Sequence, residues 1–116
     1  MTAEEYDKLT NEEKRIKVAE LCGWTDFEMY EVNGRTVWYG FHDTHHPQTK
    51  YRYVTPLPDY LNDLNAMHKA ENANITNTLS PKYNKTLFDV CIRVGWHPER
   101  ATAAQRAKAF VLTMTE

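Results

Sequence analysis

The chain has 116 residues, enough for one domain with a modest hydrophobic core, and its 41% apolar and 26% charged fractions are typical of a soluble globular protein. Fourteen basic and sixteen acidic residues leave a net charge of −2, which argues against duplex nucleic acid as the main partner because phosphate binding needs a basic surface. No apolar run approaches the roughly 20 residues that span a bilayer. The acidic N-terminus, MTAEEYDKLT, does not have the pattern of a secretory signal. We therefore expect a cytoplasmic protein without a membrane partner.

The first predicted helix begins at Thr10. Thr10 and Glu13 form a capping box, and Gly23 is the expected stop after Cys22. Thr2 with Glu5 is a weaker box that could start a short preceding turn. Neither Cys22 nor Cys91 has metal-ligand spacing, so both are predicted to be reduced, small hydrophobic residues.

A β-hairpin follows. Phe27–Val32 and Arg35–Phe41 flank Asn33-Gly34, a pair that tolerates the positive φ angles of a tight turn. Lys50–Val54 is predicted as a third short strand, which completes an antiparallel meander. On the second strand, one face is expected to carry Arg35, Val37, Tyr39 and Phe41, and the other Thr36, Trp38 and Gly40.

The segment Pro58–Glu71 (PDYLNDLNAMHKAE) is predicted to be helical from its start, because proline is favoured in a first helical turn. Counting 100° per residue gives the segment two sides. The apolar side is expected to hold Tyr60, Leu61, Leu64, Met67, His68 and Glu71, and the opposite side Asn62, Asp63, Ala66, Lys69 and Ala70.

Two more helices are predicted near the C-terminus. Ser80-Pro81 is read as an N-cap followed by a first-turn proline, which favours a helix over Lys82–Arg93, although its apolar residues also alternate as in a strand. Thr102 and Gln105 cap the last helix. Its apolar stripe comprises Ala103, Ala107, Phe110, Val111 and Met114. The expected fold is therefore α+β, a single domain over residues 1–116 with helices packed on a small antiparallel sheet.

PDYLNDLNAMHKAE and the later ATAAQRAKAFVLTM resemble blocks of the small phage and prophage proteins of the phage ABA-sandwich type, and IKVAELCGW followed by an aromatic hairpin fits their order. The resemblance covers most of residues 11–115. It implies an alpha-beta-alpha sandwich in a cytoplasmic accessory protein of a bacterial host. That family has no established catalytic motif, so no functional residue is carried over. The loop FHDTHHPQTKYRY is longer than the resemblance leads us to expect.

The loop after the hairpin contains the best metal candidates, His42, Asp43, His45 and His46. These are suitable ligand types for a divalent ion, but one loop rarely closes a tetrahedral site, so His68 or His97 would have to contribute. We favour an exposed polar turn before Pro47 over a metal-dependent hydrolase.

His68 and Glu71 lie one helical turn apart. The carboxylate could orient the imidazole as a base or help to bind a ligand. The favoured interpretation is a buried contact that fixes the helix on the sheet. The sequence shows neither an activated nucleophile nor a glycine-rich phosphate loop, so a non-enzymatic role without cofactor is favoured.

Aromatic residues make up 12% of the chain and gather between Trp24 and Tyr53, with two arginines among them. Such a set suits stacking on nucleobases and pairing with phosphates, and it equally suits a protein-binding hot spot. A meander buries one face, so a partner or a second copy is expected to cover the other, as a homodimer or higher homo-oligomer. The predicted ligand-binding residues are Trp24, Arg35, Trp38, Tyr39, Tyr51, Arg52 and His68.

Three functions follow from these features. The first is a phage accessory protein of the counter-defence type that sequesters a small anionic, nucleotide-like ligand. The second is an inhibitor that blocks a host defence protein through the aromatic hairpin. The third, least favoured, is the metal-dependent hydrolase.

Overall fold

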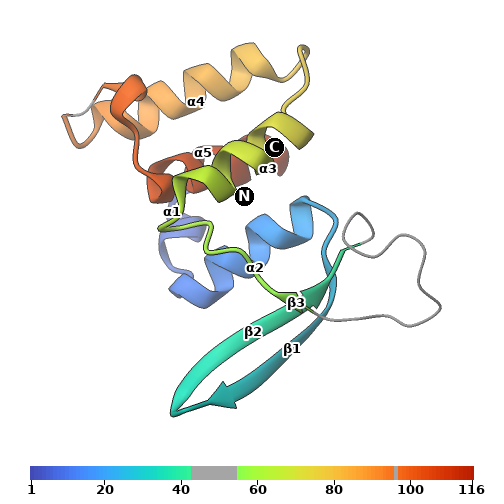
Figure 1. The fold of residues 1–116 in the computed structure, drawn as a ribbon. Helices are drawn as coiled ribbons and strands as arrows, with labels where there is room; N and C mark the ends of the chain where they lie inside the picture. The colour runs from blue at the N-terminus through green and yellow to red at the C-terminus, as the bar shows by residue number, and fades with distance from the viewer. Residues whose placement is uncertain (43–54, 96) are drawn as a thin grey trace.

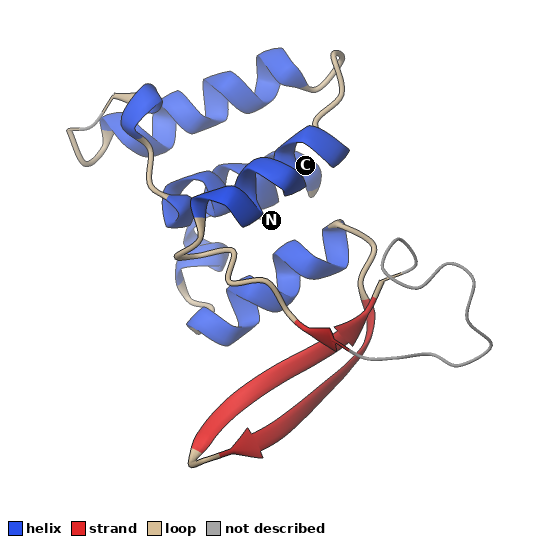
Figure 2. Cartoon of the chain, viewed as in Figure 1, coloured by secondary structure: helices blue, strands red, loops and turns tan. Residues whose placement is uncertain are grey.

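The computed structural model describes residues 1–42, 55–95 and 97–116. It contains helices and a three-stranded antiparallel sheet of order β1-β2-β3, which confirms the predicted α+β class (Figures 1 and 2). The elements, in chain order, are α1 (Ala3–Asp7), α2 (Asn11–Leu21), β1 (Thr25–Val32), β2 (Arg35–Phe41), β3 (Thr55–Pro56), α3 (Leu64–Asn74), α4 (Ser80–Ile92), the 3-10 helix η1 (Pro98–Arg100) and α5 (Ala103–Met114).

Helix α5 is the centre of the helical part of the molecule. It contacts α1, α2, α3 and α4. The predicted stripe is confirmed, with Phe110 and Val111 fully buried and Met114 partly buried. Ala109 and Thr113 are buried as well, so α5 is covered on more than the one side that the pattern indicated.

The helix starts predicted from capping boxes are confirmed at all three threonines. In the last box Thr102 donates its N–H to Gln105 Oε1 at 2.9 Å and accepts from the Gln105 N–H at 3.2 Å. Gly23 follows α2 with a φ of 95°, as expected for a helix stop. The boxes of α1 and α2 begin at Thr2 and Thr10.

Helix α4 confirms the helical alternative for its segment, but Ser80 does not cap it. Leu79 occupies the N-cap position without a side-chain hydrogen bond, and Ser80 and Pro81 are the first helical residues. Proline is tolerated there because the N–H groups of the first turn have no partner within the helix.

Helix α3 begins later than predicted. Residues 60–62 form a turn, and Asp63 caps the helix by accepting the N–H groups of Asn65 and Ala66. The predicted apolar side was counted from a start at Pro58 and is therefore wrong in part. Leu64 is 41% exposed, whereas Ala66 and Ala70, placed on the polar side, belong to the core. Tyr60 and Leu61 are buried by the turns rather than by the helix.

The hairpin turn is confirmed, with positive φ at both Asn33 (51°) and Gly34 (77°). β1 begins at Thr25, slightly before the predicted Phe27. The predicted strand Lys50–Val54 lies outside the described residues. The described third strand, β3, pairs only with Tyr39 and Gly40 of β2. Figure 1 shows that the hairpin projects away from the helices, so only its base meets the core.

The base of the hairpin is closely packed at Gly40. A Cβ atom there would lie 3.0 Å from Leu57 Cδ2, 3.1 Å from Trp24 Cε3 and 3.4 Å from Phe27 Cδ1. Leu57 and Trp24 are buried, and Phe27 packs against the same core. The absence of a side chain at Gly40 therefore lets β2 approach the helical core.

We expect Gly40→Ala to lower the free energy of unfolding by about 1–3 kcal/mol, because an added methyl overpacks this site. Urea denaturation followed by tryptophan fluorescence measures the change. Thr36→Ser, on the exposed part of the same strand, is the control and should stay within about 0.5 kcal/mol of the wild type. Equal stability of all three proteins would show that the base of the hairpin can relax freely.

Candidate functional site

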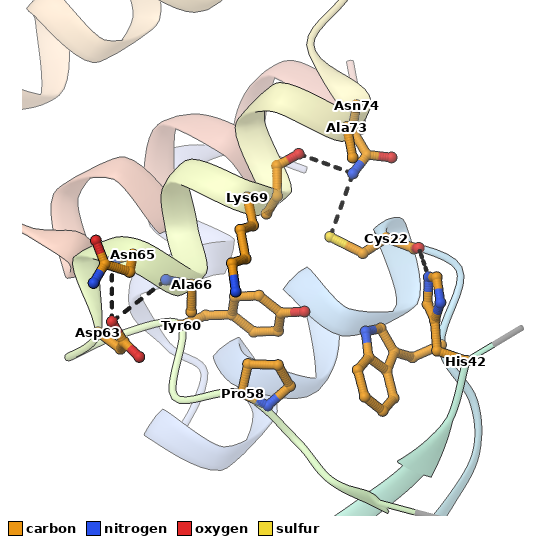
Figure 3. A pocket seen from close by; sticks show the side chains of 12 residues that line it. Cys22, His42, Pro58, Tyr60, Asp63, Asn65, Ala66, Lys69, Ala73 and Asn74 are labelled. Atoms are coloured by element: carbon orange, nitrogen blue, oxygen red, sulfur yellow. Dashed lines mark hydrogen bonds between the residues drawn. The ribbon is translucent and has the colours of Figure 1, made fainter. Parts of the chain in front are cut away.

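A pocket of about 420 Å³ lies beside α3 (Figure 3). It is bounded by α3, by the junction between α2 and β1, by the end of β2 and by the turns that precede α3. Its lining residues are Cys22, Trp24, His42, Pro58, Tyr60, Asp63, Asn65, Ala66, Lys69, Ala70, Ala73 and Asn74.

The pocket exists because α3 presents small side chains on this side. Ala66, Ala70 and Ala73 recur at helical spacing, and their methyl groups leave space that longer side chains would fill. Lys69 and Asn65 stand beside them on the same helix and line the pocket. The site therefore combines an apolar wall with a few polar groups, as small-ligand pockets commonly do.

One end of the pocket is held by hydrogen bonds around the Cys22 thiol. Asn74 Nδ2 donates to Cys22 Sγ at 3.5 Å and to the Ala70 carbonyl at 2.9 Å. Tyr60 lines the pocket beside this group. Burial raises the pKa of Cys22 to about 11, so at neutral pH the thiol is protonated and does not act as a thiolate nucleophile.

His42 is fixed at the rim of this pocket. Its Nε2 lies 2.8 Å from the Cys22 carbonyl oxygen, and its ring packs against the Trp24 ring with centroids 5.3 Å apart. A carbonyl only accepts, so Nε2 carries the proton and is not free to bind a metal.

The predicted metal cluster is not tested as a whole, because Asp43, His45 and His46 lie outside the described residues. Across residues 1–42, 55–95 and 97–116, no group of three or more His, Cys, Asp or Glu side chains could hold a metal ion. Of the four candidates the structure describes only His42, whose Nε2 lies 2.8 Å from the Cys22 carbonyl oxygen.

The predicted ligand-binding residues do not form one site. Trp24 lines the pocket, whereas Arg35 is at the hairpin tip, paired with Val32. Arg35 lies six residue steps from Phe41 along the extended strand, or roughly 20 Å. Tyr39 packs edge-to-face on Tyr30, with centroids 5.2 Å apart.

The other predicted residues lie elsewhere or are not described. Trp38 is partly buried against the core, and His68 does not line the pocket. Tyr51 and Arg52 lie outside the described residues. Arg35 is separated from the pocket because the hairpin projects away from the helices (Figure 1).

The sequence interpretation missed Tyr60, Asn65, Lys69 and Asn74 as pocket residues. Lys69 was assigned to the solvent side of the helix, which in the structure is the pocket side. The available signal was the alanine spacing at 66, 70 and 73, since small residues on one helix face permit either close packing or a hollow.

His68 and Glu71 belong to a second polar cluster, which joins α3 to α4 and α5. Glu71 Oε2 accepts hydrogen bonds from Tyr83 Oη at 2.7 Å and from Arg106 Nη1 at 2.9 Å, and Glu71 Oε1 lies 3.5 Å from His68 Nδ1. The side chain of Glu71 is 12% exposed and that of His68 is 46% exposed. Burial, followed by the hydrogen bond to Glu71, raises the pKa of Tyr83 well above its ordinary value, so this phenol remains a donor.

The prediction that the His68–Glu71 contact fixes the helix on the sheet is wrong about the sheet. The contact exists, but Glu71 anchors α3 to Tyr83 and Arg106 of the neighbouring helices and not to the sheet. The reason is tertiary, since α3 contacts α5 and the hairpin projects elsewhere.

Comparison with protein-family models, with curated proteins and with solved structures finds no match to this chain. Among the described residues, no helix is long and apolar enough to cross a bilayer.

We expect Arg106→Ala to lower the free energy of unfolding by about 3 kcal/mol, because it leaves the buried Glu71 carboxylate without its cation. Chemical denaturation measures this loss. His68→Ala is the matched control, and its effect should be at most about 1 kcal/mol because His68 is half exposed. The double variant Glu71→Leu/Arg106→Met should regain much of the loss, and failure to do so would mean that packing, not charge, dominates.

Proposed function

We propose that this chain is a non-enzymatic binding protein that holds a small anionic, nucleotide-like ligand in the pocket beside α3. The observation that carries the proposal is a hollow of about 420 Å³ in which an alanine wall meets Lys69 and the amides of Asn65 and Asn74. An apolar wall favours the flat body of a ligand, and the ammonium and amides supply the polar contacts that orient it.

The chemistry of the pocket supports binding over catalysis. Cys22 is a protonated thiol that accepts a hydrogen bond from Asn74. Burial raises the pKa of Tyr60 above its ordinary value, so the phenol is no base at neutral pH. His42 Nε2 lies 2.8 Å from the Cys22 carbonyl oxygen, which orients the imidazole ring. These groups hold the pocket in shape.

Sequestration of a host defence signal is the biological role that we propose for this binding. Its support is the resemblance of residues 58–71 and 101–114 to small phage accessory proteins of the ABA-sandwich type. A protein that binds such a signal without converting it lowers its free concentration. A cytoplasmic site of action in a bacterial host belongs to the same proposal.

A panel of cyclic mononucleotides, nucleosides and ADP-ribose derivatives tests ligand binding through the melting temperature of the protein. A ligand present at 100 times its Kd stabilises the folded state by about 2.7 kcal/mol, which should raise the melting temperature by several degrees. Mass spectrometry of the ligand released on heating should recover it unchanged. Recovery of a hydrolysed product would contradict the non-enzymatic role.

Two substitutions by leucine on α3 provide a test of the site and its matched control. Ala73→Leu fills the pocket and should abolish the ligand-induced shift, whereas Asn72→Leu, exposed and outside the lining, should keep it. A shift that survives Ala73→Leu would place the ligand elsewhere, and flat melting curves across the panel would argue against a ligand of this class.

The projecting hairpin favours a second candidate function, inhibition of a host protein. Met29, Tyr30 and Val32 are 55%, 47% and 44% exposed, and large apolar side chains gathered on one ribbon are typical of protein-binding surfaces. An isolated two-stranded hairpin is only marginally stable in water, so a partner that covers it also stabilises it. A host protein or a second copy of this chain, in a homodimer or higher homo-oligomer, could be that partner.

We expect the double variant Tyr30→Ser/Val32→Ser to lose at least about tenfold of any specific host protein captured from bacterial lysate, because it removes two exposed anchors. Quantitative mass spectrometry of the captured proteins gives the ratio. Phe88→Ser/Ile92→Ser is the matched control, since both residues are exposed on α4. Equal capture by all three proteins would exclude the hairpin, and light scattering would detect self-association.

A further inference from the structure

The electrostatic composition of the pocket beside α3 limits the charge of its ligand, if the proposed binding function holds. Among the described residues that line the pocket, Lys69 is the only lysine or arginine. Arg35, the cation expected to pair with a phosphate, stands at the far end of the hairpin. The pocket therefore offers one strong cation and not the cluster of guanidinium groups that polyphosphates require.

The carboxylate of Asp63, which also lines the pocket, disfavours further negative charge on a ligand. Asp63 lines the pocket and, because it caps α3, its Oδ1 accepts the N–H groups of Asn65 and Ala66 at 3.0 and 3.4 Å. These bonds hold the carboxylate in place (Figure 3). A second anionic group on a ligand would meet Asp63, and the described lining residues include no second lysine or arginine to offset the repulsion.

The size of the pocket points in the same direction. About 420 Å³ lies toward the low end of the roughly 300–1,000 Å³ found for small-ligand pockets. Such a volume suits one flat ring system with a short polar substituent. Two nucleoside units exceed it unless one of them remains in solvent.

We propose that the pocket selects a ligand no larger than a mononucleotide that carries a single negative charge paired with Lys69. The apolar body of this ligand lies along Ala66, Ala70 and Ala73. Asn65 and Asn74 lie at the two ends of this wall on α3. Asn65 supplies its amide to the heteroatoms of the ligand, and Asn74, whose Nδ2 donates to Cys22 Sγ and to the Ala70 carbonyl, supplies its amide oxygen. Cyclic 3′,5′-AMP has this chemistry, adenosine lacks the charge, and ADP-ribose has two charges and a second sugar.

Isothermal titration calorimetry at low salt with these three probes tests the inference. Cyclic 3′,5′-AMP should bind the wild type about three- to tenfold more tightly than adenosine, and more tightly than ADP-ribose. Lys69→Met should remove the preference over adenosine, and Lys69→Arg should keep most of it. Lys85→Met, an exposed lysine of α4 outside the lining, makes the same change in net charge and should bind like the wild type.

Two results would overturn the inference. Equal binding of adenosine and cyclic 3′,5′-AMP, blocked in both cases by Ala73→Leu, would leave the binding function standing and remove the role of Lys69. If ADP-ribose bound most tightly of the three probes, the binding function would stand and the selection for a single negative charge would be overturned. Binding of none of the probes would overturn the charge selection together with the proposed ligand class.

Discussion

The packing of the other helices around α5 is the constraint on which the rest of the structure depends. Phe110 and Val111 are fully buried, and each such side chain contributes roughly 1.5–3 kcal/mol by leaving water. Ala103 and Ala107 are buried on the same helix. Because their side chains are small, the neighbouring helices can pack close to α5. α3, which contacts α5, takes its position from this packing, and the pocket lies on its other side.

Helix α3 has separate groups for stability and for binding. On one side Glu71 joins Tyr83 and Arg106, a partly buried charged network that removal of one partner would leave uncompensated. On the other side the alanines leave the hollow that Lys69 borders. Because the network fixes the rotation of the helix about its own axis, it also determines which side chains line the pocket.

The pocket and the hairpin are two different surfaces, although the aromatic residues of both come from neighbouring segments. Trp24 and Tyr60 line the pocket but are only 5% and 4% exposed, so they offer little surface for stacking. Tyr30 and Met29 project from the hairpin into solvent and suit contact with another protein. A nucleotide-like ligand and a macromolecular partner could therefore be bound independently.

The sequence alone determined the elements whose signals are local. The threonine capping boxes, the Asn33-Gly34 turn and the first-turn proline of α4 each act within four residues, so their positions could be predicted. Tertiary structure decided the rest. Asp63 rather than Pro58 starts α3, since Tyr60 and Leu61 are buried in turns against the core. The Glu71–Arg106 pair spans 35 residues, and the pocket needs three segments to meet. The local hydrophobic pattern of the sequence does not predict such contacts, because they depend on how the helices pack around α5.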